Sequence, residues 1–73
     1  MSLGREGIVQ HMQAGCVLVK SIKQLKRPFF LQSVVQTVYV DARVVNSIIS
    51  DNLVKVSKED ENYIEYILNE ENN

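Results

Sequence analysis

The stretch 41–51 restricts the fold of this chain more than any other part of its sequence. Its aliphatic residues recur at the three- and four-residue spacing that places side chains on one side of a helix. These residues are Val44, Val45, Ile48 and Ile49. Asp41 precedes them and can accept hydrogen bonds from the N–H groups of a first helical turn, whereas Asn52 is typical of a left-handed helix stop. The sequence therefore predicts a capped helix over 42–51.

Three further segments show helical spacing. Residues 5–14 carry Ile8, Val9 and Met12, and Gly15 follows at a position suited to end a helix. Segment 17–26 has apolar residues at i, i+1, i+4 and i+7, although 16–19 also fits the start of a strand. Segment 29–39 repeats the pattern, and the alternation over 36–41 fits a strand as well. We expect helices over all three, with a break at Pro28.

The last third of the chain predicts a hairpin. Residues 53–56 form a short apolar run, 57–62 are polar, and 63–68 read as the return strand. The spacing of Tyr63, Ile64, Ile67 and Leu68 also fits a helix, which Ser57 and Asp60 would open as a capping box. We interpret the segment as a strand, because apolar runs bracket a polar tip. Nothing divides the 73 residues, so one domain over 1–73 is expected, with flexible ends at 1–4 and 69–73.

This order of elements resembles a winged helix-turn-helix, an α+β fold of about three helices followed by a two-strand hairpin. The resemblance covers residues 17–68 and is one of pattern, carried by SVVQTVYVDARVVNSIISDNLVKVS. It implies a supporting helix over 33–38, a turn at 39–41, a recognition helix over 42–51 and a wing entered through 52–56. It departs from the superfamily at the turn, where Tyr39 stands in place of the frequent glycine. Another small α/β module, or a mainly helical one, is the alternative fold.

The winged-helix interpretation predicts a small DNA-binding regulator of transcription, replication or partition, acting as a homodimer. A recognition helix needs an apolar back and a polar front, and Arg43 and Asn46 suit guanine and adenine edges in the major groove. Small hydroxyl side chains and flanking cations suit phosphates. The predicted nucleic-acid-binding residues are Arg43, Asn46, Ser47, Ser50, Lys55, Lys58, Lys23 and Arg27. Dimer contacts are expected from the N-terminal helix or from the segment 63–68.

Charge is distributed unevenly along the chain. Residues 20–58 hold seven basic and two acidic residues, a net charge of +5, whereas residues 59–73 hold six acidic residues and no basic one. A basic body with an acidic tail is expected where the body faces a polyanion. The overall pI of about 5.7 is instead compatible with solvated charged faces.

The alternative function is a protein-interaction module, an adaptor or small complex subunit, without nucleic-acid binding. In that case the contact residues would be Phe29, Phe30, Tyr63 and Tyr66. An enzyme is not expected, since the glycines lack the spacing of a phosphate loop and no small-molecule substrate cleft is evident. His11 and Cys16 alone do not make a metal site, so no metal or cofactor is expected. One cysteine, with no signal sequence or long apolar span, predicts a soluble cytoplasmic chain away from membranes.

Overall fold

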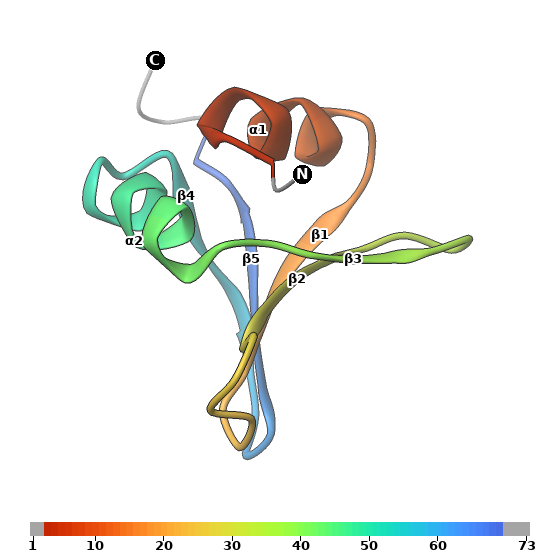
Figure 1. Ribbon diagram of the computed structural model, residues 1–73, viewed down its shortest axis with the longest axis vertical. Coiled ribbons are helices and arrows are strands. Elements are labelled where there is room, and N and C mark those ends of the chain that lie inside the picture. The colour runs from red at the N-terminus through yellow and green to blue at the C-terminus, as the bar shows by residue number, and fades with distance from the viewer. Residues whose placement is uncertain (1–2, 70–73) are drawn as a thin grey trace.

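A computed structural model of the chain describes residues 3–69 as two helices and five strands (Figure 1). The elements follow one another as α1 (Arg5–Gln13), β1 (Val17–Ser21), β2 (Phe29–Gln32), β3 (Thr37–Tyr39), α2 (Ala42–Ser50), β4 (Val54–Glu59) and β5 (Tyr63–Leu68).

The strands form one antiparallel sheet in the order β3-β2-β1-β5-β4. Strand β1 lies at its centre, between β2 and the last strand of the chain, β5. Residues paired directly across two antiparallel strands point to the same side, so the register sorts the side chains into two faces. Leu18 pairs with both Leu31 and Tyr66, and all three are buried.

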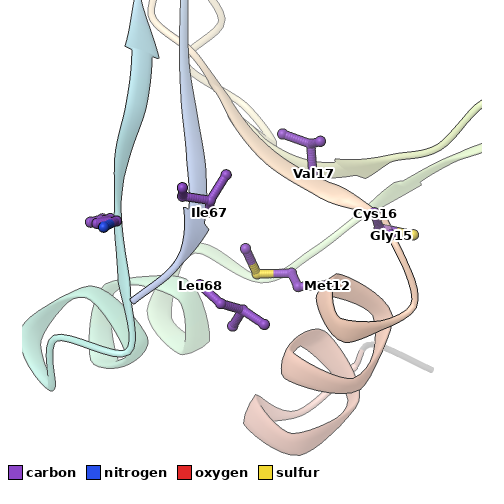
Figure 2. Close-up of a pocket in the computed structure, with 7 residues that line it drawn as sticks. Met12, Gly15, Cys16, Val17, Ile67 and Leu68 are labelled. Atoms are coloured by element: carbon purple, nitrogen blue, oxygen red, sulfur yellow. The ribbon is translucent and has the colours of Figure 1, made fainter. Parts of the chain in front are cut away.

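Both helices cover this first face, which we call the helix-covered face. Ile8 and Met12 of α1 and Val45 and Ile48 of α2 join the buried strand residues in one apolar cluster. Figure 2 shows Met12 and Leu68 on either side of the space between α1 and the end of β5. The cluster and the residues packed against it include every apolar residue of the two helices except Val9, so the hydrophobic contribution to stability comes mainly from this side of the sheet.

The sequence predictions for both helices and the last hairpin are confirmed. The helices cover 5–13 and 42–50, and the Asp41 carboxylate accepts a hydrogen bond from the Arg43 backbone N–H at 2.8 Å. Asn52 has a φ of 59° and Gly15 a φ of 110°, both left-handed stops after a helix. β4 and β5 form the predicted antiparallel hairpin, with β4 extending to residue 59.

The predicted winged helix-turn-helix is wrong. Residues 17–26 and 29–39 are not helices; they form β1 with its following loop and the β2–β3 hairpin. The alternation over 36–41 therefore belongs to a strand, and in place of a supporting helix over 33–38 the chain forms the turn at 33–36 and the start of β3. The last hairpin is not a projecting wing, since β5 pairs along β1 inside the sheet. Two helices on a five-stranded sheet replace three helices and a hairpin.

Strand pairing between distant residues determines the structure of the two segments, 17–26 and 29–39, for which helices were predicted. Apolar residues at i, i+1 and i+4 fit one helix face, but in 17–19 and 29–31 consecutive apolar residues serve opposite faces of a sheet. Arg27 has a φ of 50° before Pro28, which separates the loop from β2. The flexible ends predicted at 1–4 and 69–73 fall mostly on residues 1–2 and 70–73, outside the described residues. Asn69, which is described, donates its backbone N–H to the Leu53 carbonyl at 2.9 Å.

Candidate binding surface

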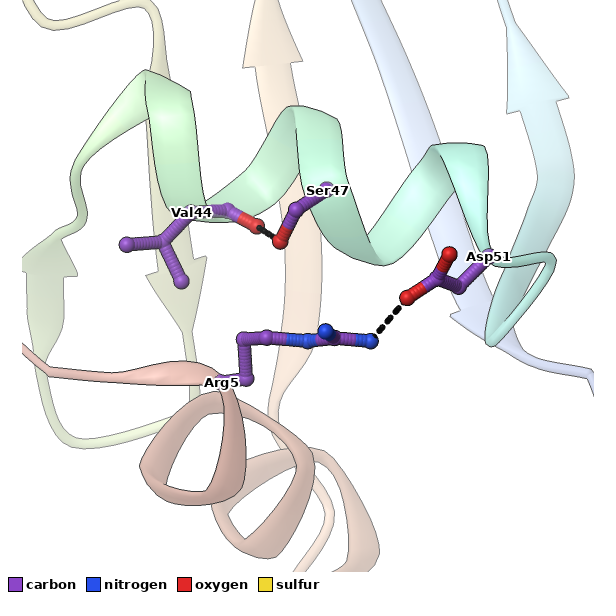
Figure 3. A network of polar contacts seen from close by, with 4 residues as sticks. All are labelled: Arg5, Val44, Ser47 and Asp51. Atoms are coloured by element: carbon purple, nitrogen blue, oxygen red, sulfur yellow. Dashed lines mark hydrogen bonds and ion pairs between the residues drawn. The ribbon is translucent and has the colours of Figure 1, made fainter.

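The predicted recognition helix presents a polar side to solvent. Arg43, Asn46 and Ser50 of α2 are exposed, while Val45 and Ile48 face the core. Ser47 is half-buried, and its hydroxyl donates to the Val44 carbonyl oxygen at 2.8 Å (Figure 3). An ion pair between Arg5 and Asp51 joins the start of α1 to the end of α2 beside it. The outward side of α2 thus consists of three accessible polar side chains and one hydroxyl that is already bonded.

The other predicted nucleic-acid contacts lie elsewhere. Lys55 pairs with Ile67 and Lys58 with Glu65, which places both lysines on the face of the sheet opposite the helices. Lys23 and Arg27 lie in the β1–β2 loop, whose Ile22 N–H donates to the carbonyl of Asn62 in the β4–β5 turn. In Figure 1 these two connections lie side by side, at the end of the sheet far from α2. The eight predicted residues therefore occupy three separate places.

The face opposite the helices is uncovered by any described element, and we call it the open face. Its central row runs across all five strands, because Tyr39 pairs with Phe30, Phe30 with Val19, Val19 with Glu65, and Glu65 with Lys58. Tyr63 and Ile67 of β5 lie on the same side, above and below this row. Aromatic and aliphatic side chains thus fill the middle of a surface that meets solvent.

The open face has a shallow groove. Its volume is about 320 Å³, and it lies among Val19, Phe30, Tyr63, Glu65 and Asp60. Val19 forms its floor at 4% exposure, although it is not part of the apolar cluster under the helices. Tyr63 is 47% exposed at the side. The groove therefore offers apolar contact at its base and carboxylates along one margin.

Aromatic side chains extend the apolar surface toward the β3 edge. The rings of Phe30 and Tyr39 have centroids 5.9 Å apart with planes tilted by 58°, a favourable aromatic arrangement. Tyr39 is 47% exposed and Ile67 41%. Contiguous exposed apolar surface of this kind marks contact sites for other molecules in small soluble proteins.

Charges of both signs border this apolar centre. Lys55 and Lys58 lie on β4, where Lys58 pairs with Glu65 of β5 and Lys55 pairs with Ile67. Asp60 orders the adjoining turn by accepting the backbone N–H groups of Asn62 and Tyr63 at 2.7 and 2.8 Å. These two hydrogen bonds lower the pKa of Asp60 below its usual value of 3.8. Since both cations and carboxylates border it, the open face is not the uniformly basic surface that a polyanion requires.

The four aromatic contact residues proposed from the sequence divide between the two faces. Phe29 and Tyr66 are buried in the core at 3% and 8% exposure, whereas Phe30 and Tyr63 lie on the open face. Burial raises the pKa of Tyr66 above 10.0, and the nearby Glu59 charge adds to the shift. Val19, Tyr39 and Ile67 are not among the contact residues predicted from the sequence, because only the alternation within strands reveals them.

No group of three or more metal-binding side chains occurs within residues 3–69. His11 Nδ1 lies 2.7 Å from the Gly7 carbonyl oxygen, and Cys16 is a free, half-buried thiol. Neither helix of the described part is long and apolar enough to cross a membrane. Comparison of the chain with protein-family models, with curated proteins and with solved structures finds no match.

Proposed function

We propose that this chain is a protein-interaction module that binds a partner protein through the open face. The observation that carries the proposal is the apolar part of the row across an uncovered sheet face, where Tyr39 is 47% exposed and Phe30 is half-buried beside Val19, which is buried at 4% exposure. A sheet face that only meets water normally has polar residues at alternate positions. The apolar residues of this row contribute little to the core under the helices, so contact with another molecule is the reason we infer for them.

The chemistry of the open face favours a protein over a nucleic acid. Its centre is aromatic and aliphatic, and toward β4 it carries the cross-strand pair of Lys58 and Glu65. A protein surface with an apolar strip and mixed charges at its margin would match both features. A phosphate backbone would match only the lysines and would be repelled by Glu65 and Asp60.

Binding to the face is better supported than binding to an edge of the sheet. β3 has three residues and offers little backbone for another strand to pair with. β4 carries a bulge between Val56 and Lys58, and lysines along its length. Short edges, bulges and lysines are the devices by which sheets discourage added strands.

The proposal is tested by measuring partner affinity with open-face variants. Proteins captured from cell extract with the tagged chain are identified, purified and titrated against it by calorimetry. Tyr63→Ser and Tyr39→Ser should each weaken the affinity about tenfold or more, since exposed tyrosines at a contact centre carry much of the binding energy. Leu25→Ser is the matched control: Leu25 is 93% exposed but lies in the β1–β2 loop.

Two results would contradict the proposal. One is a purified partner whose affinity is unchanged by both tyrosine variants. The other is an equal loss with Leu25→Ser, which would show that general surface stickiness, and not the open face, holds the partner.

A second candidate function is DNA binding through α2. The observation in its favour is the outward polar side of that helix, with Arg43, Asn46 and Ser50 clear of the protein's own packing. Fluorescence anisotropy with mixed-sequence duplex DNA at two salt concentrations tests it. Arg43→Ala should then reduce specific affinity by about 1–3 kcal/mol, and Arg5→Ala should not. Absence of salt-dependent binding removes this candidate.

A further inference from the structure

The β2–β3 hairpin ends in an apolar tip. The Ser33 N–H donates to the Gln36 carbonyl at 3.0 Å, which closes a turn with Val34 and Val35 at its centre. These are among the most exposed apolar residues of the described part, at 103% and 84%. In Figure 1 the hairpin projects sideways, away from the helices and from β5.

The geometry of the turn does not require valine at position 34 or 35. Turn centres favour glycine, asparagine, aspartate and proline, and β-branched side chains are stiff and suited to strands. The turn is instead ordered by Ser33, whose hydroxyl oxygen accepts the N–H groups of Val35 and Gln36 at 3.3 and 3.2 Å. The result is an ordered hairpin end that holds two isopropyl groups in water, where they gain nothing from the rest of the chain.

A receptor for such a tip exists on the same protein. A pocket of about 410 Å³ opens where β1 and β5 diverge, beside the end of α1. Met12, Cys16, Val17, Ile67 and Leu68 line it, as Figure 2 shows. Its lining is mainly apolar, with Lys55 the one charged lining residue among those described. The pocket has room for two valine side chains, and none of the four turn residues carries a charge.

The tip and the pocket of one molecule do not meet. Val17, in the pocket wall, pairs with Gln32, the last residue of β2, and the turn at 33–36 lies beyond this pair and points outward in Figure 1. A second molecule can supply the tip, and a two-fold axis would then place each tip in the other molecule's pocket. The net charge of −1 opposes such self-association only weakly.

We propose that the Val34–Val35 tip of one copy of this chain inserts into the Met12–Leu68 pocket of a second copy, forming a symmetric dimer. The paired surfaces are small, so the dimer is weak and reversible. This dimer needs no partner protein and does not rest on the function proposed above. Its contacts overlap in part with the dimer contacts expected from the sequence, since Met12 of α1 and Ile67 and Leu68 of segment 63–68 line the pocket, whereas the valine tip was not expected to take part.

Analytical ultracentrifugation of the untagged chain tests the dimer. The average mass should rise from 8.3 kDa toward twice that value as the concentration passes through about 10 μM to 1 mM. Val34→Asp combined with Val35→Asp should weaken association at least tenfold, and so should Ile67→Lys on the pocket side. All three positions are solvent-exposed, and circular dichroism verifies that the variants remain folded. Leu25→Asp, on the other exposed loop, is the matched control and should change nothing.

Disulfide trapping tests the same contact directly. With Val35→Cys, oxidation by copper–phenanthroline should join the introduced thiol to Cys16 of a second copy, forming a disulfide while copper(II) is reduced. A mixed disulfide found by mass spectrometry of the covalent dimer supports the contact. Leu25→Cys, an equally exposed thiol, should not trap Cys16. A monomer at every concentration, equal weakening by Leu25→Asp, or equal trapping by Leu25→Cys overturns the proposal.

Discussion

The contrast between Leu31 and the two hairpin valines gives the sharpest test of this fold. In the sheet, Leu31 is buried at 1% exposure, whereas Val34 and Val35 project into solvent. On a helix over 29–39 the same three residues would share one apolar side with Val38. Replacing each of the three residues with alanine and measuring the free energy of unfolding therefore distinguishes the sheet from a helix over 29–39.

The expected magnitudes follow from burial. Leu31→Ala removes three carbons from a site packed between Leu18 and Val38, which costs about 2.4 kcal/mol in transfer free energy. The cavity left behind brings the total loss to about 3 kcal/mol. At about 2.1 cal/mol/K of unfolding entropy per residue, this lowers the Tm by about 20 °C. Val34→Ala and Val35→Ala remove exposed groups and should each change stability by less than about 0.5 kcal/mol.

Urea unfolding followed by circular dichroism measures these differences. Protein concentrations near 1 μM are preferable, because a weak dimer through the valine tip would otherwise add stability by mass action. Equal losses for Leu31→Ala and the valine variants would refute the sheet assignment of 29–39. A loss below about 1 kcal/mol for Leu31→Ala would refute its place in the core.

Three further outcomes follow from local contacts. Asp41→Ala removes the acceptor at the start of α2 and should cost about 1 kcal/mol in chemical unfolding, with Asp41→Asn nearly neutral. The N–H groups of Asn62 and Tyr63 lower the pKa of Asp60, so its carboxyl group should titrate below pH 3.8 when it is followed by carboxyl NMR. Its contribution to stability is therefore present above that pH and is lost as the pH falls through the folded pKa, a loss that Asp60→Asn should reduce. Burial raises the pKa of Tyr66 above 10.0, so the contribution of its neutral phenol to stability is present below that pH and is lost as the pH rises through the folded pKa. Thermal unfolding measured at increasing pH should therefore show a smaller loss of stability at alkaline pH for Tyr66→Phe than for the natural sequence.

Local signals explain which elements could be predicted from sequence. The helix over 42–50 has its apolar spacing, its Asp41 cap and its Asn52 stop within twelve consecutive residues. The β4–β5 hairpin likewise has both strands and its polar turn together. An element can be predicted without knowledge of the rest of the chain when its first residue, its last residue and its buried side are all marked by neighbouring residues.

The central strands lacked such signals. Val19 and Leu18 are both buried, one on each face, and a run buried on two faces has no alternation to distinguish it from a helix. β1 is fixed by β5, which pairs Leu18 with Tyr66 far along the chain. The winged-helix interpretation therefore failed where contacts between distant residues, and not local spacing, determine the structure.

The candidate surface was predictable only in part for the same reason. Exposure of Arg43, Asn46 and Ser50 followed from the helix alone and is confirmed. The winged-helix interpretation assigns Lys55 and Lys58, at the base and tip of the wing, to the same nucleic-acid-binding surface, but the register places these lysines on the other side of the sheet. Residues can be grouped into one site only when the pairing of the strands is known. The position of β5 between β1 and β4 could not be predicted from the sequence.

The open face and the hairpin tip give this small domain two separable contacts. Val19, Phe30 and Tyr39 lie in one row across the sheet, whereas Val34 and Val35 stand beyond the ends of β2 and β3. Aspartates at the tip should therefore weaken self-association at least tenfold and leave the intrinsic partner affinity intact. Tyr63→Ser should weaken partner affinity and leave self-association intact. Ile67 is shared, since it lies on the open face and also lines the pocket. If dimerisation covers Ile67, a bound partner must compete with it, and Ile67→Lys should weaken both associations together.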